Sequence, residues 1–376
     1  MTDRTERQGR VPRVLFNMPS QPTSPSGVGR LGLELLRHLV RSNRFAYDFR
    51  GQFSREQLLE RGIEGLERVT TIPPVRGYLT ETIKSTLVAP VRFPASRYDL
   101  VVNVDPLGTA AGGRKRLTIL HDLYFKALPQ LFTPKQRLRS EIVFGLTLSR
   151  SDSIVCDSKA TEEDARKFFP RLDGRLSTIY PDSTTTAAPG DAPPPGLEPE
   201  SYVLAVSNAG VNKNFGALAD AFVQIAAERP WLRLVHVGAD PHGIFATRLS
   251  EAGLADRLVR RTGISDAELA TLYRFALCLC VPSLYEGFGL PLIEAQRLEC
   301  CTVYSDRSST GEVGGGGGIA FDPENVTELA GILARLADDP LLRKTLRAAG
   351  LRNAERFSWQ RAAEQYEAEF ERLVGA

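Results

Sequence analysis

The sequence has little of several features that define specialised classes of protein. Its 376 residues include five cysteines, none of them in a Cys-x-x-Cys pair, and four histidines without the spacing of metal ligands. A disulfide scaffold is therefore excluded, and we expect a reducing compartment and no structural metal. No run of about 18 apolar residues occurs, and the first residues lack the apolar stretch of a signal peptide. These absences predict a cytoplasmic protein that does not span a membrane.

The overall net charge of +2 hides a large asymmetry along the chain. Up to residue 185 there are 29 Lys and Arg against 20 Asp and Glu, and after it 18 against 25. The basic half lacks the aromatic platforms and modules of polynucleotide binders, so we expect no nucleic acid partner. Two interpretations stay open. The basic half presents either an ordinary solvated face or a surface that binds an anionic acceptor or an anionic membrane. In the membrane case the protein would be peripheral at the inner face of the membrane.

Strand and helix patterns alternate in two series. The first series has strand candidates at Val11–Met18, Tyr98–Val104, Arg116–Leu120 and Ser151–Ser158. The second series runs from about residue 201, with helical spacing between short apolar strands. A stretch rich in Pro, Thr and Ala separates the series and is the best linker. This pattern predicts an α/β protein of two doubly wound parallel-sheet domains, with ligands at the carboxyl ends of the strands.

The strongest candidate site is the segment Pro282–Ala295, PSLYEGFGLPLIEA. It follows an apolar strand, and its glycine-rich loop leads into a helix near Pro291. We expect backbone N–H groups at the positive end of this helix to bind phosphate, contributed by Gly287, Phe288, Gly289 and Leu290. Glu286 can accept hydrogen bonds from sugar hydroxyls, and Glu294 from a ribose diol. The alternative is that both glutamates merely cap or solvate the helix.

This segment resembles the signature of the retaining glycosyltransferases of family 4, also called group 1, and in particular the mannosyltransferase-like members. The resemblance covers nearly the whole chain and is firmest from Ser201 onward. It implies the GT-B fold: two Rossmann-like domains that face a cleft, with a C-terminal helix that crosses back to the N-terminal domain. It also implies that Glu286 holds the donor sugar and Glu294 the nucleotide ribose.

Three further segments fit the resemblance. Lys213 occupies the place of a basic residue that neutralises the donor diphosphate, whereas Asn212 stands where many relatives have a second cation. Gly27 and Gly29 are similar to a glycine loop that approaches the donor phosphates. His121 follows a strand and resembles a histidine of the cleft, so the resemblance implies catalytic roles for His121 and Glu286. The residues expected to bind the donor are Gly27, Gly29, Asn212, Lys213, Gly287, Phe288, Gly289, Leu290 and Glu294.

We predict four regions: an N-terminal acceptor-binding domain (1–182), a linker (183–200), a C-terminal nucleotide-sugar-binding domain (201–356), and a helix returning to the N-terminal domain (357–376). The expected reaction moves a hexose from a nucleotide diphosphate, with GDP-mannose favoured, to a hydroxyl of a glycan or lipid-linked saccharide, without a metal or cofactor. A nucleotide-sugar epimerase and a catalytically silent sugar-nucleotide-binding subunit are the alternatives. Acceptor choice is expected to reside in loops at Phe45–Leu79 and Phe125–Arg139.

Overall fold

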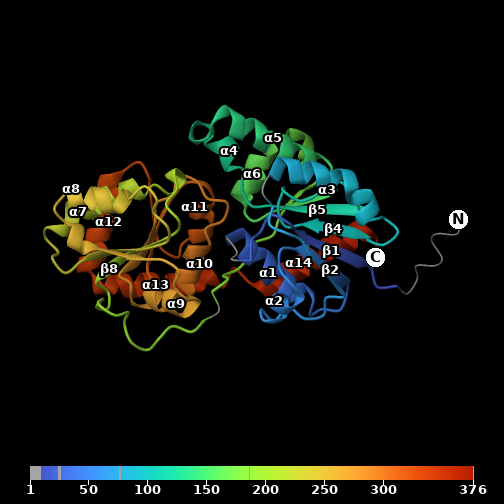
Figure 1. The fold of residues 1–376 in the computed structure, drawn as a ribbon. Coiled ribbons are helices and arrows are strands. Elements are labelled where there is room, and N and C mark those ends of the chain that lie inside the picture. The colour runs from blue at the N-terminus through green and yellow to red at the C-terminus, as the bar shows by residue number, and fades with distance from the viewer. Residues whose placement is uncertain (1–9, 24–26, 76–77, 186, 376) are drawn as a thin grey trace. The chain divides into compact units, whose positions relative to one another are not determined.

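The chain divides into two compact units. The computed structural model describes residues 10–23, 27–75, 78–185 and 187–375. Unit 1 comprises Met1–Pro181 together with Ser358–Ala376, and unit 2 comprises Asp182–Phe357 (Figure 1). The segment that the sequence analysis treats as a linker is grouped with unit 2. Its last residue, Glu200, forms ion pairs there with Arg343 and Arg347.

Unit 1 is built on a parallel sheet of seven strands in the order β3-β2-β1-β4-β5-β6-β7. The strand order reverses next to β1, which has β2 on one side and β4 on the other. The strands are β1 (Arg13–Met18), β2 (Ala46–Gly51), β3 (Arg68–Thr71), β4 (Leu100–Asn103), β5 (Lys115–Leu120), β6 (Ser153–Cys156) and β7 (Leu176–Thr178).

Helices cover both faces of this sheet. Figure 1 shows α1 and α14 on one face, and α3, α5 and α6 on the other. The helical segments are α1 (Gly27–Leu39), α2 (Arg55–Leu59), α3 (Tyr78–Arg92), α4 (Tyr124–Ala127), η1 (Pro129–Leu131), α5 (Pro134–Ser149), α6 (Lys159–Phe168), η2 (Pro170–Leu172) and α14 (Trp359–Val374).

The expectation of a loop at Phe45–Leu79 is wrong, because this region contains β2, α2, β3 and the start of α3. Charged residues interrupt the apolar pattern of β2, yet Asp48 and Arg50 are buried. Asp48 accepts a hydrogen bond from Tyr98 (2.7 Å), and the Arg50 guanidinium lies 5.5 Å from the ring centroid of Phe93. These partners offset the cost of burying charge, and no local sequence pattern predicts them. The second expected loop, 125–139, is likewise largely helical.

The last helix, α14, completes unit 1 from the far end of the chain. It packs against α1 and β4. Aromatic side chains of α14 contact rings from the first fifty residues of the chain. Trp359 stacks on His38 with ring centroids 6.0 Å apart, and Phe370 packs edge-on against Phe45 with ring centroids 5.6 Å apart. The amphipathic pattern of α14 is therefore satisfied inside unit 1.

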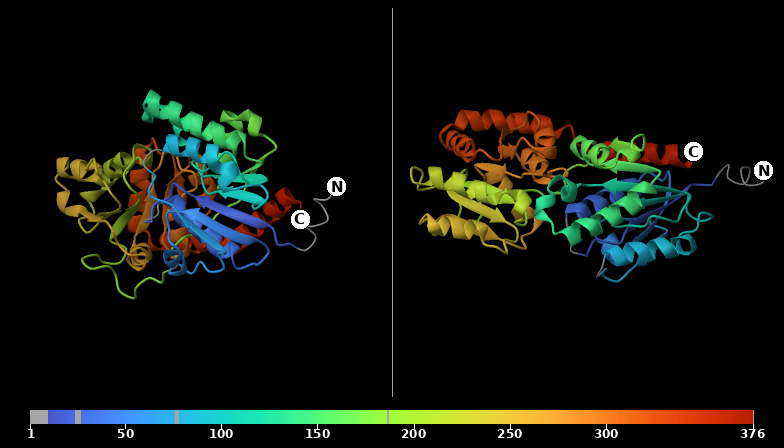
Figure 2. Two further views of the ribbon diagram at one scale, coloured as in Figure 1. Left: turned by 45° about the vertical axis from the view of Figure 1, so that its right-hand side comes forward. Right: turned by 90° about the horizontal axis from the view of Figure 1, so that it is seen from above.

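Unit 2 has a parallel sheet of six strands in the order β10-β9-β8-β11-β12-β13. Helices α7, α8 and α12 pack on one another at one face, and α10 packs with α9, α11 and α13 at the other (Figure 2). The strands are β8 (Tyr202–Val206), β9 (Arg233–Val237), β10 (Leu258–Arg261), β11 (Cys278–Val281), β12 (Thr302–Ser305) and β13 (Ile319–Phe321). The helical segments are η3 (Val211–Lys213), α7 (Phe215–Ala226), α8 (Ile244–Glu251), η4 (Ala255–Arg257), α9 (Asp266–Phe275), α10 (Leu290–Arg297), α11 (Ser308–Gly314), α12 (Val326–Asp338) and α13 (Pro340–Ala354).

The strands of unit 2 that carry the site are almost fully buried, which explains their continuous apolar sequence. β8 and β11 lie side by side at the centre of the sheet and have buried side chains along nearly their whole length. All five cysteines lie within the described ranges as buried free thiols. Among the described helices, none combines the length and apolar character needed to cross a bilayer.

Candidate functional site

The candidate site of unit 2 lies where its strand order reverses. The chain proceeds from β8 outward through β9 to β10, and then returns to β11 on the other side of β8. Loops that leave the carboxyl ends of such a strand pair diverge, and ligands of doubly wound sheets bind there. The loop after β8 carries Asn212 and Lys213, and the loop after β11 carries Glu286. Lys213 and Glu286 thus lie together although they are more than seventy residues apart in the sequence.

Lys213 and Glu286 form an ion pair across this switch point. The Lys213 ammonium lies 2.7 Å from Oε1 and 2.9 Å from Oε2 of Glu286. The Ser283 hydroxyl also donates to Oε1 of Glu286 (2.6 Å). Both side chains are partly accessible, with relative exposures of 22% and 15%. Lys213 has three N–H donors and directs two at Glu286, so one remains for another acceptor.

Hydrogen bonds hold the two loops together and shape the ion pair. The Asn212 side chain donates to the Tyr285 carbonyl (3.2 Å), and the Leu284 N–H donates to the Asn212 carbonyl (2.7 Å). The carbonyl of Glu286 accepts from the hydroxyls of Ser308 (2.7 Å) and Ser309 (2.9 Å). Asn212 therefore fixes the loops, and it adds no charge to the site.

The glycine-rich loop ends at the first turn of α10. Gly289 is the residue before the helix and has φ of +101°, a conformation that L side chains rarely adopt. Leu290 is the first helical residue and Pro291 the second, where a missing N–H costs nothing. The side chain of Phe288 is buried edge-on against Phe357, with ring centroids 5.7 Å apart. Phe288 thus anchors the loop, and only the backbone of this stretch could meet a phosphate.

Glu294 lies one turn into α10 and is buried. Its Oε2 accepts a hydrogen bond from the Tyr273 hydroxyl (3.0 Å), and its Oε1 accepts one from the Thr184 hydroxyl (3.3 Å). These two hydroxyls hold the carboxylate near the start of α10. The local sequence pattern predicts Glu294 but not Tyr273 and Thr184, because these partners come from distant segments.

In unit 1 the predicted glycines lie at the equivalent switch point, between β1 and β4. Gly27 and Gly29 belong to the first turn of α1, so the expected glycine loop is wrong at these two positions. Ser26, which precedes them in the motif, lies outside the described residues. A Cβ on the next glycine of the helix, Gly32, would come within 2.7 Å of Val104, so glycine allows α1 to approach the end of β4.

His121 follows β5 and uses both ring nitrogens within unit 1. Nδ1 lies 2.5 Å from the Asp157 carboxylate, and Nε2 lies 2.6 Å from the Val104 carbonyl oxygen. A carbonyl can only accept, so Nε2 carries a proton. Burial lowers the pKa of His121, but the Asp157 carboxylate outweighs this effect and raises the pKa to about 9. His121 is therefore an imidazolium at neutral pH.

A second buried polar cluster at the same switch point escapes sequence analysis. Asp105 follows β4 and accepts hydrogen bonds from the Ser20 hydroxyl and from the Gln21 amide (3.0 Å). All three side chains are less than a tenth exposed. A carboxylate close to the end of a buried strand is a signal in the sequence that could have identified Asp105. Ser20 and Gln21 lie in a Pro/Ser loop that carries no such signal.

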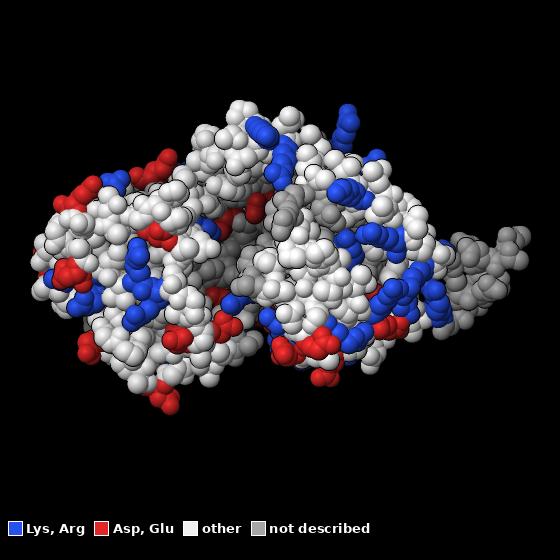
Figure 3. All heavy atoms as spheres, viewed as in Figure 1, with Lys and Arg blue, Asp and Glu red and all other residues white. Residues whose placement is uncertain are grey.

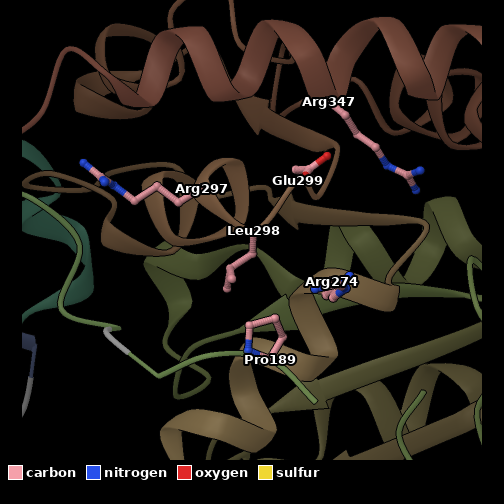
Figure 4. Close-up of a pocket in the computed structure, with 6 residues that line it drawn as sticks. All are labelled: Pro189, Arg274, Arg297, Leu298, Glu299 and Arg347. Atoms are coloured by element: carbon pink, nitrogen blue, oxygen red, sulfur yellow. The ribbon is translucent and has the colours of Figure 1, made fainter. Parts of the chain in front are cut away.

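A pocket of about 330 Å³ lies at the opposite end of α10 from Glu286. Its lining residues are Pro189, Arg274, Arg297, Leu298, Glu299 and Arg347 (Figure 4). Arg274 and Arg297 occupy last turns of helices, where a cation complements the helix dipole. Figure 4 shows Arg297 and Arg347 pointing in opposite directions, and each is paired with a carboxylate. The helix termini explain the arginines of this pocket, and none of the predicted site residues lines it.

The described ranges contain no cluster of three His, Cys, Asp or Glu side chains that could hold a metal ion. The positive charge at the switch point of unit 2 comes instead from Lys213 and the amino end of α10.

Two all-parallel, doubly wound units define the class of this protein as GT-B. The fold is similar to that of a sucrose-phosphate synthase from Thermosynechococcus elongatus, with a TM-score of 0.75, 19% identity, and coverage of 97% of this chain and 100% of that one. Residues 200–339, most of unit 2, match the family model described as Glycosyl transferases group 1. This part of the chain is similar to the glycosyltransferases of that group.

Known relatives are similar over part of their length. An MMP alpha-(1->4)-mannosyltransferase from Mycolicibacterium hassiacum is 34% identical over 46% of this chain and 43% of its own. An O-antigen chain mannosyltransferase B from Escherichia coli is 26% identical over 67% of this chain and 68% of its own. The chain thus matches less than half of the first relative and about two thirds of the second.

Proposed function

We propose that this chain is a retaining, metal-independent glycosyltransferase that moves a hexose from a nucleotide diphosphate to an acceptor hydroxyl. The observation that carries the proposal is the Lys213–Glu286 pair at the switch point of unit 2, beside the amino end of α10. This arrangement offers a cation, a helix dipole and a sugar-binding carboxylate in one place. The family match over residues 200–339 supports the same activity.

The leaving diphosphate needs compensation of its negative charge. The third N–H of Lys213 supplies one charged hydrogen bond, and the amino end of α10 adds a partial positive charge. Gly287, Gly289 and Leu290 present backbone to the same region, with Phe288 as their anchor. In unit 1, Gly27 and Gly29 stand at the amino end of α1, where backbone N–H groups can bind a phosphate. A cation and helix termini thus perform the role that a divalent metal has in other transferases.

The sugar and ribose contacts are assigned to the two glutamates of unit 2. Glu286 accepts hydrogen bonds from hexose hydroxyls, and Glu294 accepts them from the ribose diol. His121 supplies a positive charge in unit 1, and a direct contact with the sugar would require its Nε2–H to exchange the Val104 carbonyl for a substrate oxygen. Asn212 positions the loop that carries Lys213.

The bond changes follow from retention at the anomeric carbon. The bond from that carbon to the diphosphate oxygen breaks, the bond to the acceptor oxygen forms on the same face, and the leaving phosphate takes the acceptor proton. No covalent enzyme intermediate is required. Glu286 stabilises the positive charge that develops on the sugar ring in the transition state.

GDP-mannose is the favoured donor, because two relatives of this chain are named mannosyltransferases. The acceptor is a hydroxyl of a glycan or lipid-linked saccharide, bound by unit 1. The proposed location is cytoplasmic, and the buried free thiols suit a reducing compartment.

The test is release of nucleotide diphosphate from a panel of GDP-, UDP- and dTDP-sugars, each with and without saccharide acceptors and with and without a chelator. Acceptor-dependent release that persists with chelator is expected for GDP-mannose, and NMR of the product should show the donor's anomeric configuration. Conversion of the sugar without acceptor would make the chain an epimerase. Binding without any turnover across a broad acceptor set would make it a silent subunit. Inversion at the anomeric carbon would overturn the retaining mechanism.

A further inference from the structure

Helix α3 of unit 1 exposes a stripe of large apolar side chains. Ile83, Leu87 and Val91 are spaced four residues apart, so they lie on one side of the helix. Their relative exposures are 41%, 74% and 84%. Single exposed apolar residues are ordinary on protein surfaces, but an aligned series marks an interaction surface.

The neighbouring helix α5 also exposes large apolar side chains. Leu138 and Ile142 are 60% and 45% exposed and are also spaced four residues apart. Helices α3 and α5 pack against each other, and Figures 1 and 2 show them side by side on the same face of the unit 1 sheet. We call the five side chains Ile83, Leu87, Val91, Leu138 and Ile142, with the cations among them, the α3–α5 surface.

The opposite sides of both helices carry the buried side chains. Thr82, Ser85 and Ala89 are buried on α3, and Val143 and Thr147 are buried on α5. The exposed stripe is therefore additional to the packing face of each helix. An ordinary surface helix would place polar residues at these positions.

Basic residues surround the apolar stripe. Five cations are exposed and have no ion-pair partner among the described residues: Lys84, Arg92, Lys135, Arg137 and Arg139. The nearby acid Glu141 is paired with Lys126 at 2.6 Å. Figure 3 shows Lys and Arg side chains over the part of unit 1 where Figure 1 places α3 and α5. The described side chains of this surface therefore carry a positive net charge.

We infer that the α3–α5 surface docks on an anionic lipid bilayer, with its apolar stripe in the boundary between headgroups and acyl chains. Apolar side chains flanked by cations are the composition of interfacial helices, and each cation near an anionic surface adds to binding. A second copy of this chain is a poorer occupant, because a twofold contact would place the same five cations against each other.

The experiment measures co-sedimentation of the full chain with vesicles of phosphatidylcholine alone or with one third phosphatidylglycerol. We expect binding to the mixed vesicles at low salt, weak binding to phosphatidylcholine, and release at high salt. The charge variant K135Q/R137Q/R139Q should bind on the order of a hundredfold more weakly, since each cation contributes about fivefold. The apolar variant L87S/V91S/L138S keeps every charge and should also lose binding.

Matched controls lie on exposed parts of α12 and α13 in unit 2. R335Q/K344Q/R352Q removes three exposed cations and leaves the overall charge equal to that of the charge variant, and L341S removes an exposed leucine. Both controls should bind mixed vesicles like the parent. Equal losses in the control would mean that net charge alone drives binding and would overturn the surface assignment.

Two other results would also overturn the inference. One is the absence of binding to mixed vesicles at low salt. The other is a dimer in light scattering that L87S/V91S/L138S dissociates while vesicle binding is missing, which would assign the surface to a second copy. The inference does not depend on the proposed transferase activity, because vesicle binding is measured without donor or acceptor.

Discussion

The two units place polar side chains at the same point of their sheets but use them in different ways. In unit 2 the Lys213–Glu286 pair is partly accessible and keeps one N–H donor for another acceptor. In unit 1 the corresponding groups are buried and mutually satisfied, with Asp105 accepting from Ser20 and Gln21, and His121 held by Asp157. The first arrangement suits a charged ligand, and the second fixes the ends of β4, β5 and β6.

The units also differ in how the chain builds them. Unit 2 is one continuous segment, whereas unit 1 needs residues from both ends of the chain. Stability of unit 1 should therefore respond to changes in α14, and activity should respond most to changes in the loops of unit 2.

Phe370→Ala should destabilise unit 1 by about 3–5 kcal/mol, because Phe370 is fully buried against Phe45. Hydrogen exchange resolved by segment is the measurement, and unit 2 amides should keep their protection. Phe222→Ala, which opens a cavity in the core of unit 2, should give the reverse pattern. Equal loss of protection in both units after Phe370→Ala would contradict the division.

Asp157→Asn should remove a pH dependence of stability. The pKa of His121 is raised from 6.5 to about 9, so its ion pair contributes fully below pH 6.5 and is lost as pH rises through 9. The free energy of unfolding should fall by up to about 3 kcal/mol over this range in the parent. Urea titrations should show a flatter profile in the variant, while exposed Asp173→Asn keeps the parental slope. An unchanged slope in Asp157→Asn would refute the charged pair.

Glu286→Gln should reduce turnover about a hundredfold, since it removes a charge that stabilises the transition state. Affinity for the nucleotide diphosphate should not fall, because Lys213 loses a competing partner. Initial rates and calorimetry measure the two quantities. Glu299→Gln, an exposed change beyond the other end of α10, is the control and should leave both unaltered. Turnover within twofold of the parent would remove Glu286 from the active site.

Lys213→Ala should weaken binding of the nucleotide diphosphate by about tenfold or more, because charged hydrogen bonds contribute about 1.5–3 kcal/mol. Calorimetry measures the change, and exposed Lys344→Ala serves as control. Unchanged affinity would mean that backbone groups bind the diphosphate without this cation.

The part of the fold that could be predicted is the part with regular local patterns. The buried strands β1, β4 and β5 and most elements of unit 2 show apolar runs or helical spacing. The sequence of β2 does not predict a strand, because Asp48 and Arg50 interrupt its apolar pattern. Partners that include Arg13, Tyr98 and Asn17 stabilise these two charges in the interior. Such partners are distant in sequence, so no local window contains them.

The same reasoning separates the two candidate sites. Glu286, Gly289 and Glu294 lie within one short segment, so spacing and resemblance both identify them. The cluster of Asp105, Ser20 and Gln21 is assembled from two loops that meet only when β1 and β4 pair. A sequence alone reveals the first kind of site and leaves the second to the structure.

The return of α14 to unit 1 has a consequence for synthesis of the chain on the ribosome. Roughly 180 residues separate Pro181 from the last helix, and translation at about 5–20 residues per second takes roughly 10–35 s to make them. During that interval the face of α1 that later meets α14 has no partner. Unit 2 can complete its fold first, although it is made second. A nascent chain would therefore depend on chaperones to protect α1, and slowed translation of unit 2 should increase aggregation of unit 1.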